Sequence, residues 1–214
     1  KFAVSGGAIT LDGGPQRGLT LGKLGLIEQG AIVCEGETIL AVGGEAEMLE
    51  RFPLADRVDL RGRAVVPGFV DPHTHLIWAG NRAGEFEMRL QGKSYMEIMA
   101  AGGGILATLT ATREASLEQL VEEARSRADS AFTYGTTTIE AKTGYGLDIE
   151  IELRQLAAIL ELDRTAPIDV VPTYMGAHTI PPEFKRDTAG YTRFLCEEAL
   201  PATKQWWLAH ASDR

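Results

Sequence analysis

The chain has 214 residues, of which 44% are hydrophobic and 24% are charged, a composition typical of a globular protein that can bury a core. Its formal net charge of −9 argues against nucleic acid or an anionic membrane as a partner, because both favour clustered Lys and Arg. A small-molecule partner is the better expectation. With Cys34 and Cys196 as the only cysteines, we expect no disulfide framework, and the reducing cytoplasm is the natural compartment.

The first 63 residues predict a small β-domain. Residues 31–34 and 38–42 are β-rich runs on either side of a glycine-containing turn, which is the sequence pattern of a hairpin. Residues 58–60 form the last predicted strand of this region. The turn at 61–63 is predicted to lead into a second region, which places a domain boundary after Arg63.

From Ala64 onward, predicted strands alternate with predicted helices. The apolar run at 65–70 predicts a strand buried on both faces. Residues 136–140 are β-branched and predict a second strand. Residues 168–174 predict a third, although Pro172 cannot donate a hydrogen bond to a neighbouring strand.

Two helices are predicted between these strands. Ser116 can cap the first, with Gln119 three residues later, and apolar residues recur at helical spacing over 149–160. Strand, helix, strand, helix and strand predict a parallel sheet with right-handed crossovers. Because a complete eight-stranded α/β barrel takes about 250 residues, residues 64–214 are expected to hold its first three or four units.

Two histidines follow the first of these strands. His73 and His75 lie one residue apart, and a two-residue period directs both side chains to one face. Neutral imidazole is a common metal ligand, and the carboxyl end of a barrel strand is where such enzymes build their sites. The alternative is that both are polar residues in a turn opened by Asp71 and Pro72.

The sequence resembles the amidohydrolase superfamily. VVPGFVDPHTH at 65–75 resembles the first barrel strand of that superfamily, and AIVCEGETILAVGG with DLRGRAVVPG resembles the small β-domain that precedes the strand. Within the superfamily, the chain is most similar to the imidazolonepropionase family. The segments that carry this similarity are HTHLIWAGNR at 73–82, GKSYMEIMAAGGGI at 92–105, TTTIEAKTGYGL at 136–147 and PTYMGAH at 172–178.

The resemblance implies an α/β fold, with an incomplete TIM-like (β/α)8 amidohydrolase barrel over 64–214 and a small β-sandwich-type domain over 1–63. It also implies one zinc or iron ion, and a homodimer for the complete protein. The implied substrate is 4-imidazolone-5-propanoate, which water opens to N-formimino-L-glutamate in histidine degradation.

The resemblance also assigns roles to individual residues. His73 and His75 would be metal ligands. Arg82 would pair with the propionate of the substrate, because a guanidinium fork suits a carboxylate, with Tyr95 as a weaker candidate at that end. Tyr145 would donate a hydrogen bond to the substrate. The alternatives are a solvated surface charge for Arg82 and an aromatic cover over the core for Tyr145.

His178 would contact the substrate and help to transfer protons. The alternatives are a third metal ligand and a hydrogen-bonded structural histidine. Glu140 and Lys142 share one face of their predicted strand, and an ion pair that steadies the barrel mouth is the favoured interpretation. His210 is not a candidate ligand, because no strand leads into it and the segment departs from the family pattern after about Pro201.

A catalytic zinc typically takes three protein ligands, and the remaining ligands and the general base are not visible in this sequence. We therefore predict that the 214-residue polypeptide alone is inactive and poorly soluble. Two alternative functions stay open. One is another amidohydrolase that acts on a nucleobase-like or cyclic amide ring, although Arg82, Tyr145 and the segment 92–105 favour the imidazolone. The other is a non-catalytic remnant or binding protein with a truncated or altered tail.

Overall fold

The computed structural model describes residues 2–11, 14 and 16–211. The chain divides into two compact units, Lys1–Gly68 and Phe69–Arg214. This division lies five residues after the predicted boundary at Arg63. The assignment of the second unit to a metal-dependent hydrolase barrel stays a prediction.

The first unit contains one four-stranded sheet. Its strand order is β3-β2-β1-β4, in which β1 pairs antiparallel with β2 and parallel with β4. The predicted hairpin is confirmed as β2 and β3, which pair antiparallel. The elements are β1 (Phe2–Thr10), the 3-10 turn η1 (Gly18–Thr20), β2 (Gly25–Glu35), β3 (Thr38–Gly44), α1 (Glu45–Arg51) and β4 (Asp56–Val65).

The predicted turn at 61–63 does not end the last strand of this unit. Arg61 and Gly62 have φ angles of 53° and 78°, yet β4 continues to Val65. The pairing with β1 moves from Asp59 to Ala64 across this irregularity, so the residues form a bulge inside one strand. The prediction of an exit turn was wrong, because glycine at positive φ suits a bulge as well as a turn. A β-sandwich, which needs a second sheet, stays a prediction.

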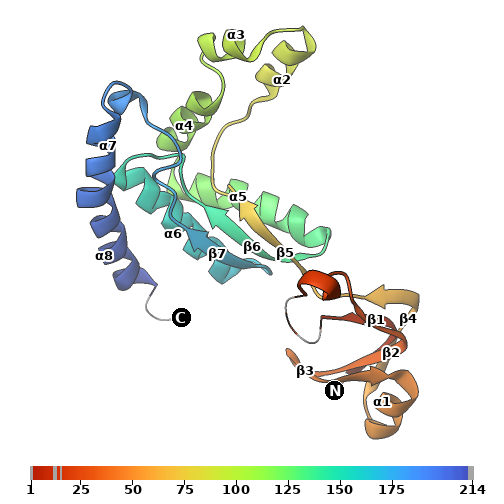
Figure 1. The fold of residues 1–214 in the computed structure, drawn as a ribbon. Coiled ribbons are helices and arrows are strands. Elements are labelled where there is room, and N and C mark those ends of the chain that lie inside the picture. The colour runs from red at the N-terminus through yellow and green to blue at the C-terminus, as the bar shows by residue number, and fades with distance from the viewer. Residues whose placement is uncertain (1, 12–13, 15, 212–214) are drawn as a thin grey trace. The chain divides into compact units, whose positions relative to one another are not determined.

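The second unit is built on a parallel sheet with the order β5-β6-β7. Its strands are β5 (Phe69–Thr74), β6 (Thr136–Lys142) and β7 (Asp169–Thr173). Both pairings are parallel, which confirms the predicted topology. Figure 1 shows the three arrows side by side, with their carboxyl ends at one edge of the sheet.

The predicted helices are confirmed as α5 and α6. The Ser116 hydroxyl accepts a hydrogen bond from the Gln119 N–H at the start of α5, and the Asp148 carboxylate caps α6. The sequence did not predict the other helices. The helices of this unit are α2 (Ala83–Leu90), α3 (Tyr95–Ala100), α4 (Ile105–Glu114), α5 (Leu117–Thr133), α6 (Ile149–Thr165), the 3-10 turn η2 (Pro182–Phe184), α7 (Thr188–Phe194), the π-helical segment η3 (Leu195–Ala199) and α8 (Leu200–His210).

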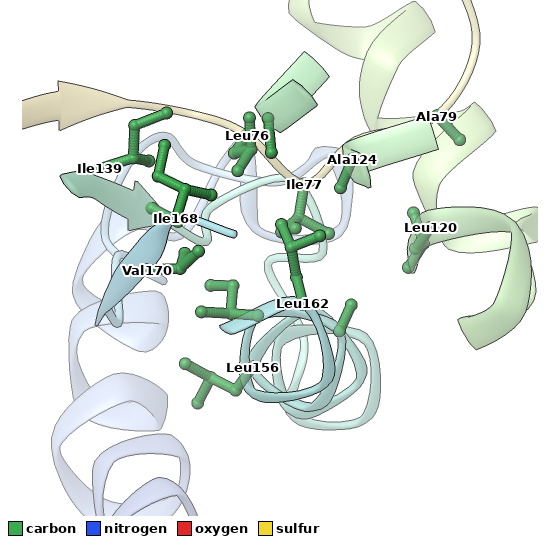
Figure 2. Close-up of a cluster of buried hydrophobic side chains, with 14 of the residues drawn as sticks. Leu76, Ile77, Ala79, Leu120, Ala124, Ile139, Leu156, Leu162, Ile168 and Val170 are labelled. Atoms are coloured by element: carbon green, nitrogen blue, oxygen red, sulfur yellow. The ribbon is translucent and has the colours of Figure 1, made fainter. Parts of the chain in front are cut away.

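The core of the second unit lies between the sheet and the helices α5 and α6. Burial of each large apolar side chain contributes about 1.5–3 kcal/mol, and this cluster supplies most of the fully buried ones in the unit. Figure 2 shows labelled side chains of the strands, such as Ile139 and Val170, and of the helices, such as Ala124 and Leu162, gathered in one cluster. Its members include Leu76, Ile77, Leu120, Ala124, Ile139, Leu156, Leu162, Ile168 and Val170.

The other face of this sheet is open. Phe69, Val70 and Val171 expose 58%, 63% and 51% of their surface. The prediction of a strand buried on both faces over 65–70 was therefore wrong for this chain. An apolar run shows that a strand can be buried, but β5 is an edge strand here and helices cover only one face.

Candidate active site

The chain that follows His75 is fixed by side chains from three helices. Arg127 of α5 donates hydrogen bonds of 3.0 Å to the Leu76 and Trp78 carbonyls, and its guanidinium lies 3.7 Å from the Trp78 ring centroid. Gln155 of α6 donates to the Ile77 carbonyl at 2.8 Å. Thr112 of α4 also accepts a hydrogen bond from the Ala79 N–H. The position of His75 at the end of β5 is thereby determined by the helices behind it.

The loops after β6 and β7 are joined to each other. Thr143 donates its N–H to the Thr173 carbonyl at 3.0 Å, and its hydroxyl accepts the Met175 N–H at 2.8 Å. Gly144 has a φ of +111°, and a Cβ there would lie 2.9 Å from His178 Cβ. Only glycine fits this approach and this φ. The close contact places Tyr145 and His178 at the same edge of the sheet.

Three aromatic rings meet at this edge. The His75 ring centroid lies 4.9 Å from that of Tyr145 and 4.6 Å from that of His178, and the Tyr145 and His178 centroids are 5.7 Å apart. Each ring follows a different strand of the parallel sheet, where the carboxyl ends of the strands converge. The structure therefore brings three of the residues named from the sequence into one cluster.

His75 has the properties of a neutral imidazole. Burial, together with the charges of His178, His73 and Lys142, lowers the pKa of His75 to about 4. Its Nδ1 atom is buried and has no hydrogen-bond partner within the described part of the chain. Because a buried polar atom without a partner costs free energy, this nitrogen is a strong candidate to bind a group that the protein alone does not supply.

A polar network lies on the open face of the sheet beside the histidines. The predicted ion pair of Glu140 and Lys142 is confirmed, and Glu140 also accepts a hydrogen bond of 2.7 Å from the Thr173 hydroxyl. The hydrogen bond from Lys142 lowers the pKa of Glu140, and the nearby His73 acts in the same direction. The exposed His73 is thus within electrostatic range of both His75 and Glu140.

Arg82 lies at the amino-terminal end of α2 and is bound to Glu85. Its Nη2 and Nε atoms donate to Glu85 Oε2 at 2.6 Å and 2.9 Å, and this pairing raises the pKa of Arg82. The other oxygen of Glu85 accepts the Gly104 N–H at 2.7 Å. Tyr145 and Tyr95 interact electrostatically with Arg82, and both raise its pKa. The residues predicted to bind the carboxylate therefore share one electrostatic neighbourhood with the ring of Tyr145.

Comparison with known proteins supports the resemblance found in the sequence. The model of the Amidohydrolase family matches residues 56–103. The imidazolonepropionase of Geobacillus kaustophilus is 48% identical over 199 residues, which cover 90% of this chain and 46% of that protein. Over most of its length, the chain is thus similar in sequence to imidazolonepropionases. It spans about half the length of the curated imidazolonepropionases that it matches.

Solved structures of lower identity share the fold. Guanine deaminase from C. acetobutylicum with bound guanine is 12% identical, with a TM-score of 0.59, and the match covers 100% of this chain and 43% of that chain. A mutant of atrazine chlorohydrolase TrzN from Arthrobacter aurescens, complexed with zinc and atraton, is 19% identical with a TM-score of 0.52 over 81% of this chain and 35% of that one. The chain thus shares its α/β fold with part of each of these structures.

Sequence reasoning missed the residues that hold this imidazolonepropionase-like site together. Arg127, Gln155 and Glu152 lie on amphipathic helices, where polar residues normally face water, yet Gln155 and Glu152 are 0% and 1% exposed. Glu85 was also missed as the partner of Arg82. The available signal was weak. Gln155 and Glu152 lie two helical turns before the buried residues Leu162 and Ile159, and this spacing places them on the buried face of the helix.

Among the described residues, no group of three or more His, Cys, Asp or Glu side chains could hold a metal ion. His73 and His75 remain the predicted pair of ligands, and the unpartnered Nδ1 of His75 fits that role. His210 is exposed and stacks on Trp206 with ring centroids 4.5 Å apart, which agrees with its exclusion. Cys34 and Cys196 are both free thiols, as expected.

A hollow of about 950 Å³ lies elsewhere, among α5, α6 and α8. Its lining includes Trp206 and His210 but none of the residues of the ring cluster. A smaller pocket is lined by Arg82, Glu85, Phe86 and Arg89. The candidate site is therefore assigned from the side chains that meet at the ring cluster, and not from the volume of a pocket.

Within the described ranges, no helix is long and apolar enough to cross a membrane.

Proposed function

We propose that the complete protein hydrolyses 4-imidazolone-5-propanoate to N-formimino-L-glutamate in histidine degradation. The observation that carries the proposal is the cluster of His75, Tyr145 and His178, with Arg82 and Tyr95 in electrostatic range. This cluster lies in a chain that is 48% identical to an imidazolonepropionase. We also propose that the complete protein is a homodimer in the cytoplasm.

The proposal includes a (β/α)8 barrel. The second unit would supply the first β/α units, and the strands that follow would cover the open face and the free edge of the sheet. Exposed apolar residues on this sheet support the idea, since Phe69, Val70 and Val171 would then be buried. Large exposed apolar surface is otherwise a site of association, and we expect the 214-residue polypeptide by itself to be inactive and poorly soluble.

One zinc or iron ion is proposed at His73 and His75. Zinc is present in the TrzN structure that shares the fold, and a neutral His75 is in the protonation state that binds metals. When bound, such an ion lowers the pKa of a water molecule toward neutrality and makes it a nucleophile. Because a catalytic zinc typically takes three protein ligands, at least one further ligand would come from another part of the complete protein.

Side chains of this chain would bind the substrate and transfer the proton. Arg82 would exchange Glu85 for the substrate carboxylate, because its planar fork fits both, and Tyr95 lies at the same end. Burial raises the pKa of Tyr145, so its phenol stays protonated and can donate a hydrogen bond. Water would attack the ring carbonyl carbon, the bond from that carbon to the ring nitrogen would break, and His178 would deliver the proton that this nitrogen gains.

The test compares two substrates on the complete protein. Purified protein would be incubated with 4-imidazolone-5-propanoate and, separately, with guanine, since guanine deaminases share the fold. We expect formation of N-formimino-L-glutamate and no xanthine. Deamination of guanine would favour the alternative amidohydrolase. Absence of both activities in protein that retains stoichiometric zinc or iron would contradict the proposal, and absence of metal as well would favour a non-catalytic remnant.

A further inference from the structure

The loop that carries Tyr145 is folded around one buried carboxylate. Glu152 of α6 is 1% exposed, and its Oε1 accepts hydrogen bonds from the backbone N–H groups of Gly146 and Leu147 at 2.8 Å and of Gly144 at 3.1 Å. The Thr143 side chain is a further hydrogen-bond partner. Donors from the two residues before Tyr145 and the two residues after it therefore converge on a single side chain.

This loop has a backbone conformation that does not persist without support. Leu147 is one of the two described non-glycine residues with positive φ, at 61°, and Gly144 has a φ of +111°. Residues in such regions are maintained only when the surrounding contacts over-determine them. The N–H groups of both residues point to Glu152, so the carboxylate supports the loop where its conformation is least favourable.

Gln155, one turn later on α6, links the same loop to His75. Its Oε1 accepts the Tyr145 N–H at 3.3 Å, and its Nε2 donates to the Ile77 carbonyl at 2.8 Å. One face of α6 thus contacts both the Tyr145 loop and the segment that follows His75. A bound substrate would have no direct access to Glu152, because the loop covers it.

We propose that Glu152 is a positioning residue, whose carboxylate fixes residues 143–147 so that the Tyr145 ring lies against His75 and His178. The inference rests on the proposed function for the role of Tyr145, and on the hydrogen bonds alone for the fixing of the loop. Glu152 does not touch the reacting atoms. It acts on the reaction through Tyr145.

A double-mutant cycle in the complete protein tests this proposal. Glu152→Gln removes the negative charge and one of the two acceptor oxygens. In either orientation its NH2 group faces the Gly144 N–H, which lies 3.1 Å from both oxygens of Glu152, so the support of the loop is weakened. Since hydrogen bonds to charged groups are comparatively strong, we expect kcat/KM to fall by about tenfold or more in otherwise folded protein. In a Tyr145→Phe background, the same substitution should cost less than about threefold, because its effect is transmitted through the tyrosine.

A matched control is available on the same helix. Glu150→Gln changes an exposed glutamate that pairs with Arg154, and it should leave kcat/KM unchanged. If Glu152→Gln costs as much in the Tyr145→Phe background as in the wild type, the positioning role is contradicted. If Glu152→Gln does not fold, Glu152→Asp keeps the charge and is measured in the same cycle. Failure of both variants to fold would assign Glu152 to fold stability and overturn the proposal.

Amide hydrogen exchange separates this inference from the proposed function. In Glu152→Gln, the Gly144, Gly146 and Leu147 amides should exchange at least about tenfold faster, whereas those of α5 should not change. This readout needs no substrate. If the wild type fails to open 4-imidazolone-5-propanoate but these amides are selectively deprotected, the proposed function fails and the loop assignment stands. Unchanged exchange at the three amides would overturn the loop assignment, whatever the activity.

Discussion

The two halves of the candidate site are built differently. The inner half consists of His75, Tyr145 and His178, which follow successive strands and are fixed from behind by Arg127, Gln155 and Glu152. The outer half consists of Arg82 and Tyr95 at the first turns of the short helices α2 and α3, with Arg82 43% exposed in its side chain and Tyr95 56% exposed. With the roles proposed above, the groups that act on the scissile bond would be held by a buried scaffold, whereas the groups that bind the carboxylate would lie at the surface.

The largest expected effect comes from the inner half. In the complete protein, His75→Ala should abolish stoichiometric metal binding and lower kcat by about 10³-fold or more, because water would lose its activation. Metal analysis after dialysis and steady-state kinetics measure both quantities. His210→Ala removes an exposed histidine of α8 and serves as the control. If the His75→Ala protein kept its metal and its kcat, the inner half would have no catalytic role.

The core beneath the inner half should be more sensitive than the helices of the outer half. Leu162→Ala removes a side chain with 0% exposure and should lower the free energy of unfolding by about 2–5 kcal/mol. Leu90→Ala, at a residue of α2 with 74% exposure, should change it by less than about 0.5 kcal/mol. Chemical denaturation of the complete protein compares the two. Equal losses would show that the two halves do not differ in support.

The outer half should control binding more than turnover. Arg82→Ala is expected to raise KM for 4-imidazolone-5-propanoate by about 10- to 100-fold with a much smaller change in kcat, because it removes a charge-assisted contact made before and during the reaction. Arg82→Lys should recover only part of this loss, since an ammonium lacks the fork. Arg89→Ala, on the same helix and in the same pocket, is the control. A loss confined to kcat would contradict the division of labour.

The smallest effect is expected at Glu85. Glu85 forms an ion pair with Arg82, and the Arg82 guanidinium holds the pKa of Glu85 below its usual range. With the proposed binding mode, the substrate carboxylate would have to displace Glu85 from Arg82. Partly exposed ion pairs contribute only about 0–1 kcal/mol, so Glu85→Gln should lower KM by no more than about fivefold. An increase in KM would instead show that Glu85 orients Arg82 for the substrate.

The features predicted from the sequence are those that a local pattern determines. The caps and apolar stripes of α5 and α6 were recognised from Ser116 and from the helical spacing over 149–160, and the strands β6 and β7 from β-branched runs. Tyr145 and His178 were named from the family resemblance, and their meeting with His75 agrees with a general rule, that the carboxyl ends of parallel strands lie at one edge.

What the sequence did not reveal depends on tertiary neighbours. The apolar run at 65–70 has the same pattern whether or not another strand covers it, so the exposure of Val70 could not be foreseen. An acidic residue in the first turn of a helix is usually explained by the helix dipole. From the sequence, Glu152 fits that explanation, and only the structure shows that it accepts hydrogen bonds from the Tyr145 loop. The ion pair of Arg82 with Glu85 was likewise not predicted, because the sequence assigned Arg82 only to the proposed substrate.

The location of the metal ion tests the central claim most directly. Anomalous diffraction at the zinc or iron edge, from crystals of the complete protein, would place the ion relative to the inner half. The account predicts a single site with ring nitrogens of His73 and His75 at about 2.0–2.1 Å if the ion is zinc, beside Tyr145 and His178. A metal bound elsewhere, with the His75 ring hydrogen-bonded to protein groups through both nitrogens, would contradict it.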